Sequence, residues 1–411
     1  MCPSYRVTRD EVHLTRGRAN TLRLALSGQL GADFASEAVR EALDLCVSCK
    51  GCRRDCPTGV DMAKMKIEFL HHWHRAHGLS FKDRAVAYLP RWAPWAARLP
   101  WLANLRETLP GVARLTERWT GFSARRSLLK WRGDTFLRSQ ERVMATNEPA
   151  DVVLFVDTFT QYFEPENAHA AIKVLNAAGY RVQVARADAG DAEPGRPLCC
   201  GRTFLAAGLV DEAKREARRV VAALLPQVEG GAAVIGLEPS CLLSLRDEFL
   251  VMGLGDAAQR LADSAWLIEE FLAREHHAGR LKLPLAALPE KRALLHGHCH
   301  QKAFDAVTPA QVVLKLIPGL AVELIESSCC GMAGAFGYET AHYDVSMQMA
   351  ELALLPAVRN AEATTLIVAD GTSCRHQIAD GTRESGAREA VHVVRVLARS
   401  LASVTATAAR T

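Results

Sequence analysis

Four cysteines in one eleven-residue run constrain this 411-residue chain more than any other feature. The run is Cys46-Val-Ser-Cys49-Lys-Gly-Cys52-Arg-Arg-Asp-Cys56-Pro57, which is C-x2-C-x2-C-x3-C followed by proline. Two-residue gaps let three thiolates curl around one metal centre, and this spacing is typical of bacterial [4Fe-4S] sites. Zinc is the rival, because C-x2-C also binds zinc. Four thiols and the proline together favour an iron–sulfur cluster.

The fourth cysteine of such a run often binds a neighbouring cluster, because paired runs exchange that ligand. Upstream of the run, Cys2-Pro3 has the form of the end of a second run. We therefore expect Cys2, Cys46, Cys49 and Cys52 to share one cluster and Cys56 to point to another. A simple terminal thiol at Cys2 stays open as the alternative.

Helices are expected around this run, over 17–30, 34–45 and 62–77. The last of them carries four histidines that have no cysteine or acid at ligand spacing. We interpret them as part of a solvated helix face: His71, His72, His74 and His77.

The chain repeats itself from residue 151 onward. Each repeat has a Cys-Cys-Gly element and, 41 positions after its second cysteine in the first repeat and 44 in the second, a Ser-Cys element. Strand-like and helix-like segments alternate, which predicts α/β units with parallel strands. Expected strands lie within 151–160, 181–185, 233–237, 292–301, 321–325 and 365–369, and expected helices at 167–178, 210–225 and 343–359.

Seven cysteines fall at strand ends in these repeats, where open α/β sheets bind ligands. A glycine after each pair permits the tight turn that adjacent cysteines need to face one site. The second repeat has four thiols, whereas the first has Thr158 at the place of Cys299. A cluster or redox site is the favoured interpretation, best developed in the second repeat, and buried structural cysteines are the alternative. The candidate residues are Cys199, Cys200, Gly201 and Cys241, then Cys299, Cys329, Cys330, Gly331 and Cys374, with His296, His298 and His300 open as ligands or tuning groups.

Composition excludes several whole-chain classes. Hydrophobic residues make up 49% and charged residues 23%, which is ordinary for a globular protein. No apolar run reaches the ~18 residues of a transmembrane helix, and the first residues have no signal-peptide pattern. We expect a cytoplasmic protein, in which disulfides are rare.

Charge is unevenly distributed along the chain. Residues 1–150 carry 25 basic and 15 acidic side chains, and residues 151–411 carry 25 and 31. Six of the seven tryptophans lie between Trp73 and Trp131, among many arginines and prolines. This segment is expected to contact a partner domain, with packing on the core or an anionic membrane surface as alternatives. No nucleic-acid motif is present, and we expect no nucleic-acid partner.

The ferredoxin-type run followed by two Cys-Cys-Gly repeats resembles the cysteine-rich CCG-domain iron–sulfur proteins. That family includes the iron–sulfur subunit of glycolate oxidase and cysteine-rich subunits of heterodisulfide reductase and of the anaerobic glycerol-3-phosphate dehydrogenase. The segments MCPSYRVTRDEVHLTRGRAN and AYLPRWAPWAARLPW are similar to the C-terminal part of bacterial FAD-linked oxidases of the D-2-hydroxyglutarate dehydrogenase type. In those a flavin domain precedes the cluster motifs, so the resemblance implies a separately encoded or truncated iron–sulfur half.

The resemblance implies an all-helical ferredoxin-type domain followed by two duplicated α/β CCG units. The expected divisions are 1–80 for the helical domain, 81–148 for the connecting segment, 149–290 for the first repeat and 291–400 for the second. It implies a [4Fe-4S] cluster, a second cluster at the CCG site, and FAD only on a partner.

The implied function is electron transfer from a flavin-containing dehydrogenase domain or subunit, acting on a 2-hydroxy acid, to a quinone or other carrier. The chain alone is expected to lack turnover, and it is expected at the inner face of the cell membrane or free in the cytoplasm. The alternative from another class is a metal-stabilised scaffold in which the cysteines bind zinc or only staple the fold.

Overall fold

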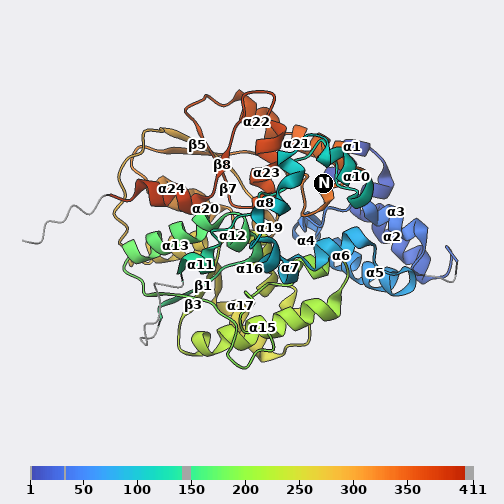
Figure 1. The fold of residues 1–411 in the computed structure, drawn as a ribbon, viewed down its shortest axis with the longest axis horizontal. Helices are drawn as coiled ribbons and strands as arrows, with labels where there is room; N and C mark the ends of the chain where they lie inside the picture. The colour runs from blue at the N-terminus through green and yellow to red at the C-terminus, as the bar shows by residue number, and fades with distance from the viewer. Residues whose placement is uncertain (1, 32–33, 141–149, 403–411) are drawn as a thin grey trace, which may run out of the picture.

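The computed structural model describes residues 2–31, 34–140 and 150–402 (Figure 1). It confirms the expected fold class, since a helical N-terminal part is followed by two α/β units with parallel strands. The expected boundary at 148–149 lies outside the described residues. No helix in the described ranges is long and apolar enough to cross a membrane.

Short helices surround the four-cysteine run. The longest, α5, begins after Asp61, whose carboxylate accepts hydrogen bonds from the backbone N–H groups of Ala63 and Lys64, and ends at Gly78, where φ is +81°. Its bounds agree with the helix expected at 62–77. The helices of this part are α1 (Pro3–Thr8), α2 (Thr15–Leu26), α3 (Glu37–Asp44), α4 (Gly51–Asp55) and α5 (Met62–His77).

One side of α5 packs against the first repeat. The ring Nδ1 of His71 donates to the carbonyl oxygen of Gly208 over 3.1 Å, and His74 donates to that of Ala207 over 2.8 Å. A Cβ atom on Gly208 would lie 2.5 Å from the backbone of this helix. The interpretation of a solvated histidine face is therefore wrong for His71 and His74, because carbonyls at a domain contact satisfy their rings. It holds for the exposed His72 and His77.

The connecting segment is a chain of short helices, in which each helix from α6 to α10 contacts the next and α11 packs on α12 (Thr158–Tyr162) and α13 (Pro165–Ala177). A proline lies in the first two positions of α7 and of α8, where its missing N–H loses no helical hydrogen bond. Figure 1 shows the segment running between the N-terminal helices and the two sheets. Its helices are α6 (Phe81–Ala87), α7 (Leu89–Ala96), α8 (Pro100–Ala103), α9 (Leu105–Thr108), α10 (Val112–Thr120) and α11 (Phe136–Gln140).

Each repeat is built on a four-stranded parallel sheet. The strand orders, β2-β1-β3-β4 and β6-β5-β7-β8, are equivalent, which confirms the duplication. The central strands β1 and β7 are buried along their whole length, as expected for parallel strands covered on both faces. The strands are β1 (Val152–Phe155), β2 (Val182–Val184), β3 (Ala233–Gly236), β4 (Ala265–Leu267), β5 (Arg292–His296), β6 (Ala321–Leu324), β7 (Leu366–Ala369) and β8 (Ala390–Val391).

The two repeats share one apolar core. Helices α13 and α24 pack on each other between the sheets (Figure 1), and the core joins Val152 and Leu154 of β1 to Leu295 of β5. The repeats are therefore fixed face to face. Their helices are α12 (Thr158–Tyr162), α13 (Pro165–Ala177), α14 (Arg202–Ala206), α15 (Val210–Glu229), α16 (Pro239–Leu245), α17 (Asp256–Ser264), α18 (Ile268–His277), α19 (Cys299–Ala303), α20 (Thr308–Lys315), α21 (Tyr343–Glu351), α22 (Leu354–Asn360), α23 (Thr372–Gly381) and α24 (Val393–Ser400).

Candidate metal centres

A cavity of about 230 Å³ opens at the four-cysteine run. Ser48 and Lys50 both adopt the left-handed conformation, with φ of +49° and +57°. These two turns of the backbone bring the cysteines on either side of them to the same cavity. Its lining includes five cysteines from two separate stretches of chain: Cys2, Cys46, Cys49, Cys52 and Cys56.

Cys2 belongs to this cavity through several contacts. Its Sγ lies 3.1 Å from the hydroxyl of Thr15, and the guanidinium of Arg18 lies 3.7 Å away. Burial raises the pKa of Cys52, and the neighbouring thiols of Cys46 and Cys2 raise it further. Three cysteines from two chain segments thus interact electrostatically across the cavity.

Cys56 is held differently from the other four thiols. Its Sγ lies 3.1 Å from the Thr58 hydroxyl. That hydrogen bond, together with one from the backbone N–H of Val60, lowers the pKa of Cys56. The side chain is also more open to solvent than Cys49, whose burial raises its pKa.

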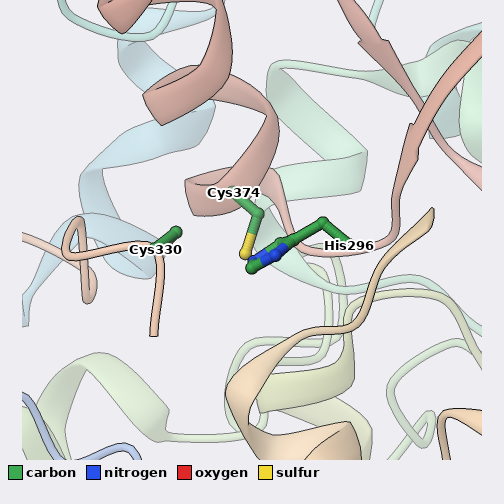
Figure 2. Close-up of side chains that lie close together, drawn as sticks. All are labelled: His296, Cys330 and Cys374. Carbon is green, nitrogen blue, oxygen red and sulfur yellow. The ribbon is translucent and has the colours of Figure 1, made fainter. Parts of the chain in front are cut away.

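The second repeat brings its four cysteines together at the carboxyl end of its sheet. Cys299 begins α19, just beyond β5, and Cys374 lies in the first turn of α23. Thiol interactions connect Cys299 with Cys329, Cys329 with Cys330, and Cys330 with Cys374. Figure 2 shows the Cys374 sulfur directed toward the ring of His296, with Cys330 on the facing loop. The ligand atoms of His296, Cys330 and Cys374 lie within 4.8 Å of one another.

Positive groups surround these thiols. The hydrogen bond with Cys329, together with the charge of His298, lowers the pKa of Cys299 to about 6. Hydrogen bonds with Cys329 and Cys374 hold the pKa of Cys330 well below its usual value. The ammonium of Lys302 donates to the carbonyl oxygens of Ser327, at 2.6 Å, and Ser328, at 3.1 Å. It thereby ties down the loop that leads into Cys329.

The residues of the second repeat fit an iron–sulfur group. His296 is fully buried, its Nδ1 lies 2.8 Å from the Ser327 hydroxyl, and its Nε2 has no hydrogen-bond partner in the described part of the chain. Burial lowers the pKa of His296 to about 4, so the imidazole is neutral and its free nitrogen can accept. Four thiols and one imidazole form a soft donor set of the kind that iron–sulfur clusters use.

The glycines of the two Cys-Cys-Gly elements have equivalent roles. The backbone N–H groups of Gly201 and Gly331 each lie 3.4 Å from the Sγ of the first cysteine in the pair. Their φ angles are +76° and +88°. A Cβ atom on Gly331 would lie 2.3 Å from the carbonyl oxygen of Ser346, so no side chain fits there.

The first repeat differs from the second at two positions. Thr158 begins α12 where Cys299 begins α19, and Glu238 precedes α16 where Gly371 precedes α23. A Cβ on Gly371 would lie 2.4 Å from the ring of His298 and 3.3 Å from the Cys374 sulfur. The first repeat therefore has a carboxylate-bearing residue where the ring of His298 leaves the second repeat no room for a side chain.

The three thiols of the first repeat are nevertheless close. Hydrogen bonds connect Cys199 to Cys200 and Cys200 to Cys241. Beside them, burial and the charge of Glu238 raise the pKa of Asp157 to about 6. Among the described residues, the set formed by His296, Cys330 and Cys374 is the only group of three or more Cys, His, Asp or Glu whose ligand atoms lie this close together.

The cavity at the four-cysteine run and the second-repeat site adjoin. Cys49 and Cys299 pack against the same small apolar cluster, which contains Val47 and Cys329. The ring of His300 donates from Nε2 to the carbonyl oxygen of Ser48 over 3.1 Å. The charge of Cys299 is also the second largest influence, after burial, that raises the pKa of Cys49.

Sequence reasoning missed two cations at these sites. Lys50 lies between two candidate ligands, is 1% exposed and forms ion pairs with Asp61, Asp247 and Glu248. Arg202 directly follows the first Cys-Cys-Gly element and is paired with Glu248. The sequence offers one signal for these two cations, which is that each lies within two residues of a candidate cysteine ligand. Nothing in the sequence indicates which carboxylates they pair with.

Two family models match the chain. Residues 1–60 match a 4Fe-4S dicluster domain, and residues 293–379 match a cysteine-rich domain. The second match covers the repeat in which four thiols converge. The matched regions and the soft donor sets together support iron–sulfur clusters as the cofactors of this chain.

Three relatives illustrate the range of similarity. D-2-hydroxyglutarate dehydrogenase of Escherichia coli is 24% identical over 92% of this chain and 40% of its own length. One subunit of the anaerobic glycerol-3-phosphate dehydrogenase of the same organism is 29% identical over 73% of this chain and 72% of its own length. Lactate utilization protein A of Bacillus licheniformis is 26% identical over 60% of this chain and 98% of its own length.

The chain thus spans about 40% of the length of the D-2-hydroxyglutarate dehydrogenases it matches. It carries the sequence signatures of both cluster-binding regions and a fold that brings these regions together. The matched regions and the converging thiols support an iron–sulfur electron-transfer component, with a 4Fe-4S dicluster match at residues 1–60 and a cysteine-rich match at residues 293–379, that is similar in sequence to D-2-hydroxyglutarate dehydrogenases.

Proposed function

We propose that this chain carries electrons from a flavin-containing dehydrogenase domain or subunit to a quinone or another carrier. The substrate class of that partner is a 2-hydroxy acid such as D-2-hydroxyglutarate, lactate or glycolate. The relatives named for D-2-hydroxyglutarate dehydrogenase and lactate utilization support this class. Iron–sulfur clusters supply one-electron transfer without acid–base chemistry of their own.

The observation that carries the proposal is the contact between the two centres. Ser48 of the N-terminal run is hydrogen-bonded to His300 of the second repeat, and Cys49 and Cys299 pack against the same apolar cluster. Two redox groups bound at these sites would be neighbours, with no other element of the fold between them. This contact supports electron transfer over a zinc-stapled scaffold, because a scaffold does not require its metal sites to adjoin.

The proposed ligands follow from the grouping of the thiols. Four thiols at the N-terminal run are proposed to bind one cubane cluster, and four thiols of the second repeat are proposed to bind a second cluster. Cys56 is left as a ligand for a separate group. The first repeat, with three thiols and two buried carboxylates, is proposed to hold no complete cluster. The two sets are Cys2, Cys46, Cys49 and Cys52, and then Cys299, Cys329, Cys330 and Cys374.

The electron count of the reaction agrees with a flavin-containing partner that oxidises the substrate and a chain that only transfers electrons. Oxidation of a 2-hydroxy acid to the 2-oxo acid releases two electrons and two protons. Each cluster accepts one electron at a time, so each substrate needs two successive passages. The flavin-containing partner releases the two protons to solvent as its flavin is reoxidised, and this chain conducts electrons alone.

Anaerobically purified protein tests the proposal. Its visible absorbance should bleach with dithionite and return when a short-chain ubiquinone analogue is added. D-2-hydroxyglutarate, D-lactate and glycolate should leave it oxidised when each is added to the chain alone. A colourless zinc-containing protein, or bleaching by a 2-hydroxy acid without a flavoprotein, would contradict the proposal.

The connecting segment supports a finer proposal on location, contact with an anionic membrane surface. Trp95, Trp101, Leu115 and Trp119 are exposed on its short helices, Trp119 to 79%. Exposed arginines lie among them, including Arg98, which stacks on Trp95. Aromatic side chains beside cations favour the interface of an anionic bilayer.

Sedimentation with vesicles separates this location from a protein contact. The holoprotein should pellet with phosphatidylglycerol vesicles at low salt and stay in solution with phosphatidylcholine vesicles. Replacing Trp101 and Trp119 by serine should abolish pelleting, whereas replacing the half-buried Trp131 by phenylalanine should not. If the same fraction of protein pellets with both vesicle types, and the tryptophan replacements do not change it, the membrane proposal is contradicted. The exposed surface would then be assigned to contact with a partner protein.

A further inference from the structure

The side chain of Arg202, which belongs to the first repeat, extends to the second repeat. It is the first residue of α14, directly after Cys199-Cys200-Gly201. One guanidinium nitrogen donates to Glu248 over 2.6 Å, and another lies 3.4 Å from Nε2 of His300. Since His300 follows Cys299, the cation lies beside the first cysteine of the second-repeat site.

The same carboxylate connects Arg202 to the N-terminal run. Glu248 lies 2.9 Å from the ammonium of Lys50, which follows Cys49. Lys50 is held in turn by Asp247 at 2.5 Å and Asp61 at 3.2 Å. Alternating charges therefore run from Lys50 through Glu248 to Arg202, alongside the contact between the two centres.

The second repeat shows that its fold does not need a cation at this position. After Cys329-Cys330-Gly331 the matching residue is Met332, which is fully buried in an apolar cluster. A cation at a largely buried place carries a desolvation cost that methionine does not. Arg202 occurs in the repeat that lacks the fourth thiol, and its guanidinium is directed at the repeat that has all four. The charge of Arg202 therefore acts on the cysteine site of the second repeat.

We propose that the positive charge of Arg202 raises the reduction potential of the second-repeat cluster relative to that of the N-terminal cluster. Reduction adds negative charge to a cluster, and a fixed positive charge nearby stabilises the reduced form. The effect directs electrons from the N-terminal centre toward the second repeat. The inference rests on the proposed function, because it requires both clusters.

Arg202→Met and Arg202→Lys test the role in the anaerobically purified holoprotein. Met reproduces the residue of the second repeat and leaves Glu248 paired with Lys50, so the fold should be kept. A potentiometric titration followed by electron paramagnetic resonance gives the midpoint of each cluster. Arg202→Met should lower the midpoint of the second-repeat cluster more than that of the other cluster, and Arg202→Lys should stay near the wild type.

Two further variants make the result unambiguous. Glu248→Gln removes the opposing charge and should shift the same midpoint upward. Arg246→Met is the matched control, because Arg246 lies in the same repeat but pairs with Glu270. It should leave both midpoints unchanged.

Unchanged midpoints in Arg202→Met, with full iron and sulfide, would overturn the role of Arg202. If that variant loses a cluster, an unchanged midpoint in Glu248→Gln would overturn it equally. Wild-type protein that holds only one cluster would instead contradict the proposed function, and with it this inference.

Discussion

The imidazole of His300 donates a hydrogen bond to the carbonyl oxygen of Ser48 across 3.1 Å, joining α19 directly to the N-terminal cysteine run. These residues are 252 positions apart in the sequence. Each is next to a candidate cluster ligand, Cys299 in one case and Cys49 in the other. The hydrogen bond and the packing of α4 on α19 therefore hold the two centres next to each other.

The grouping of Cys2 with the run predicts how single cysteine variants behave. Cys2→Ser should damage the N-terminal cluster as severely as Cys49→Ser, because both thiols line the same cavity beside Cys46 and Cys52. Cys56→Ser should keep that cluster nearly intact, because its thiol is held by Thr58 and backbone groups. Iron and sulfide content with visible spectra measure the result. Loss of the cluster in Cys56→Ser with retention in Cys2→Ser would show that the four-cysteine run binds alone.

The buried Lys50 should contribute strongly to stability. Its replacement by methionine leaves Asp61, Asp247 and Glu248 without their shared cation, and breaking a buried ion pair from one side costs about 3–5 kcal/mol. Lys64→Met is the matched control, because Lys64 also pairs with Asp247 but is one-third exposed. Its loss should cost about 1 kcal/mol or less. Urea unfolding of both variants checks the difference, and equal midpoints would contradict the account.

His342 should make stability depend on pH above neutrality. Its ring pairs with Asp44 at 2.8 Å and Glu339 at 3.3 Å. Burial lowers the pKa of His342, but these carboxylates outweigh burial and raise it to about 9. Since an unfolded histidine titrates near pH ~6.5, the stabilisation is complete below that pH and is lost as pH rises toward 9.

The size of this effect is about 1 kcal/mol, because Asp44 is half-exposed and the pair is partly screened by solvent. Unfolding free energies measured between pH ~6 and ~9.5 should fall by this amount in the wild type. The decline should be absent in His342→Gln. A variant that declines as steeply as the wild type would assign the pH dependence to other groups.

Gly331 should accept no side chain. A Cβ atom there would lie 2.3 Å from the Ser346 carbonyl oxygen, and φ of +88° disfavours any other residue. Gly331→Ala should lose the second-repeat cluster and keep the N-terminal one. Gly386→Ala is the control, because φ there is +107° but nothing lies within 4 Å. It should cost about 1–2 kcal/mol and no iron; equal iron loss in both variants would mean that strain alone accounts for the result.

The sequence predicted the elements that have a strong local signal. The helix at 62–77 was bounded correctly by Asp61 and Gly78, and the repeat was visible because Cys-Cys-Gly and Ser-Cys recur at nearly equal spacing. Strands β4 and β8 were missed, since three and two residues are too few for a period to show. The helix expected at 343–359 is two helices, α21 and α22.

Contacts between distant segments could not be predicted in the same way. Nothing in the sequence shows that His71 and His74 meet carbonyls of the first repeat, or that Lys50 meets Asp247 and Glu248. These pairs are formed by docking of separately built units. The inward-facing Nε2 of His296 likewise becomes visible only when β5 and α23 are placed side by side.

The central claim is that two clusters lie side by side, one at the N-terminal run and one in the second repeat. Electron paramagnetic resonance of the fully reduced holoprotein tests it most directly. We predict two cluster signals that broaden and split each other, and a simple single-cluster spectrum in Cys374→Ser, which removes a ligand of the second set alone. A wild-type spectrum that is the sum of two non-interacting signals, or that matches the spectrum of Cys374→Ser, would contradict the account.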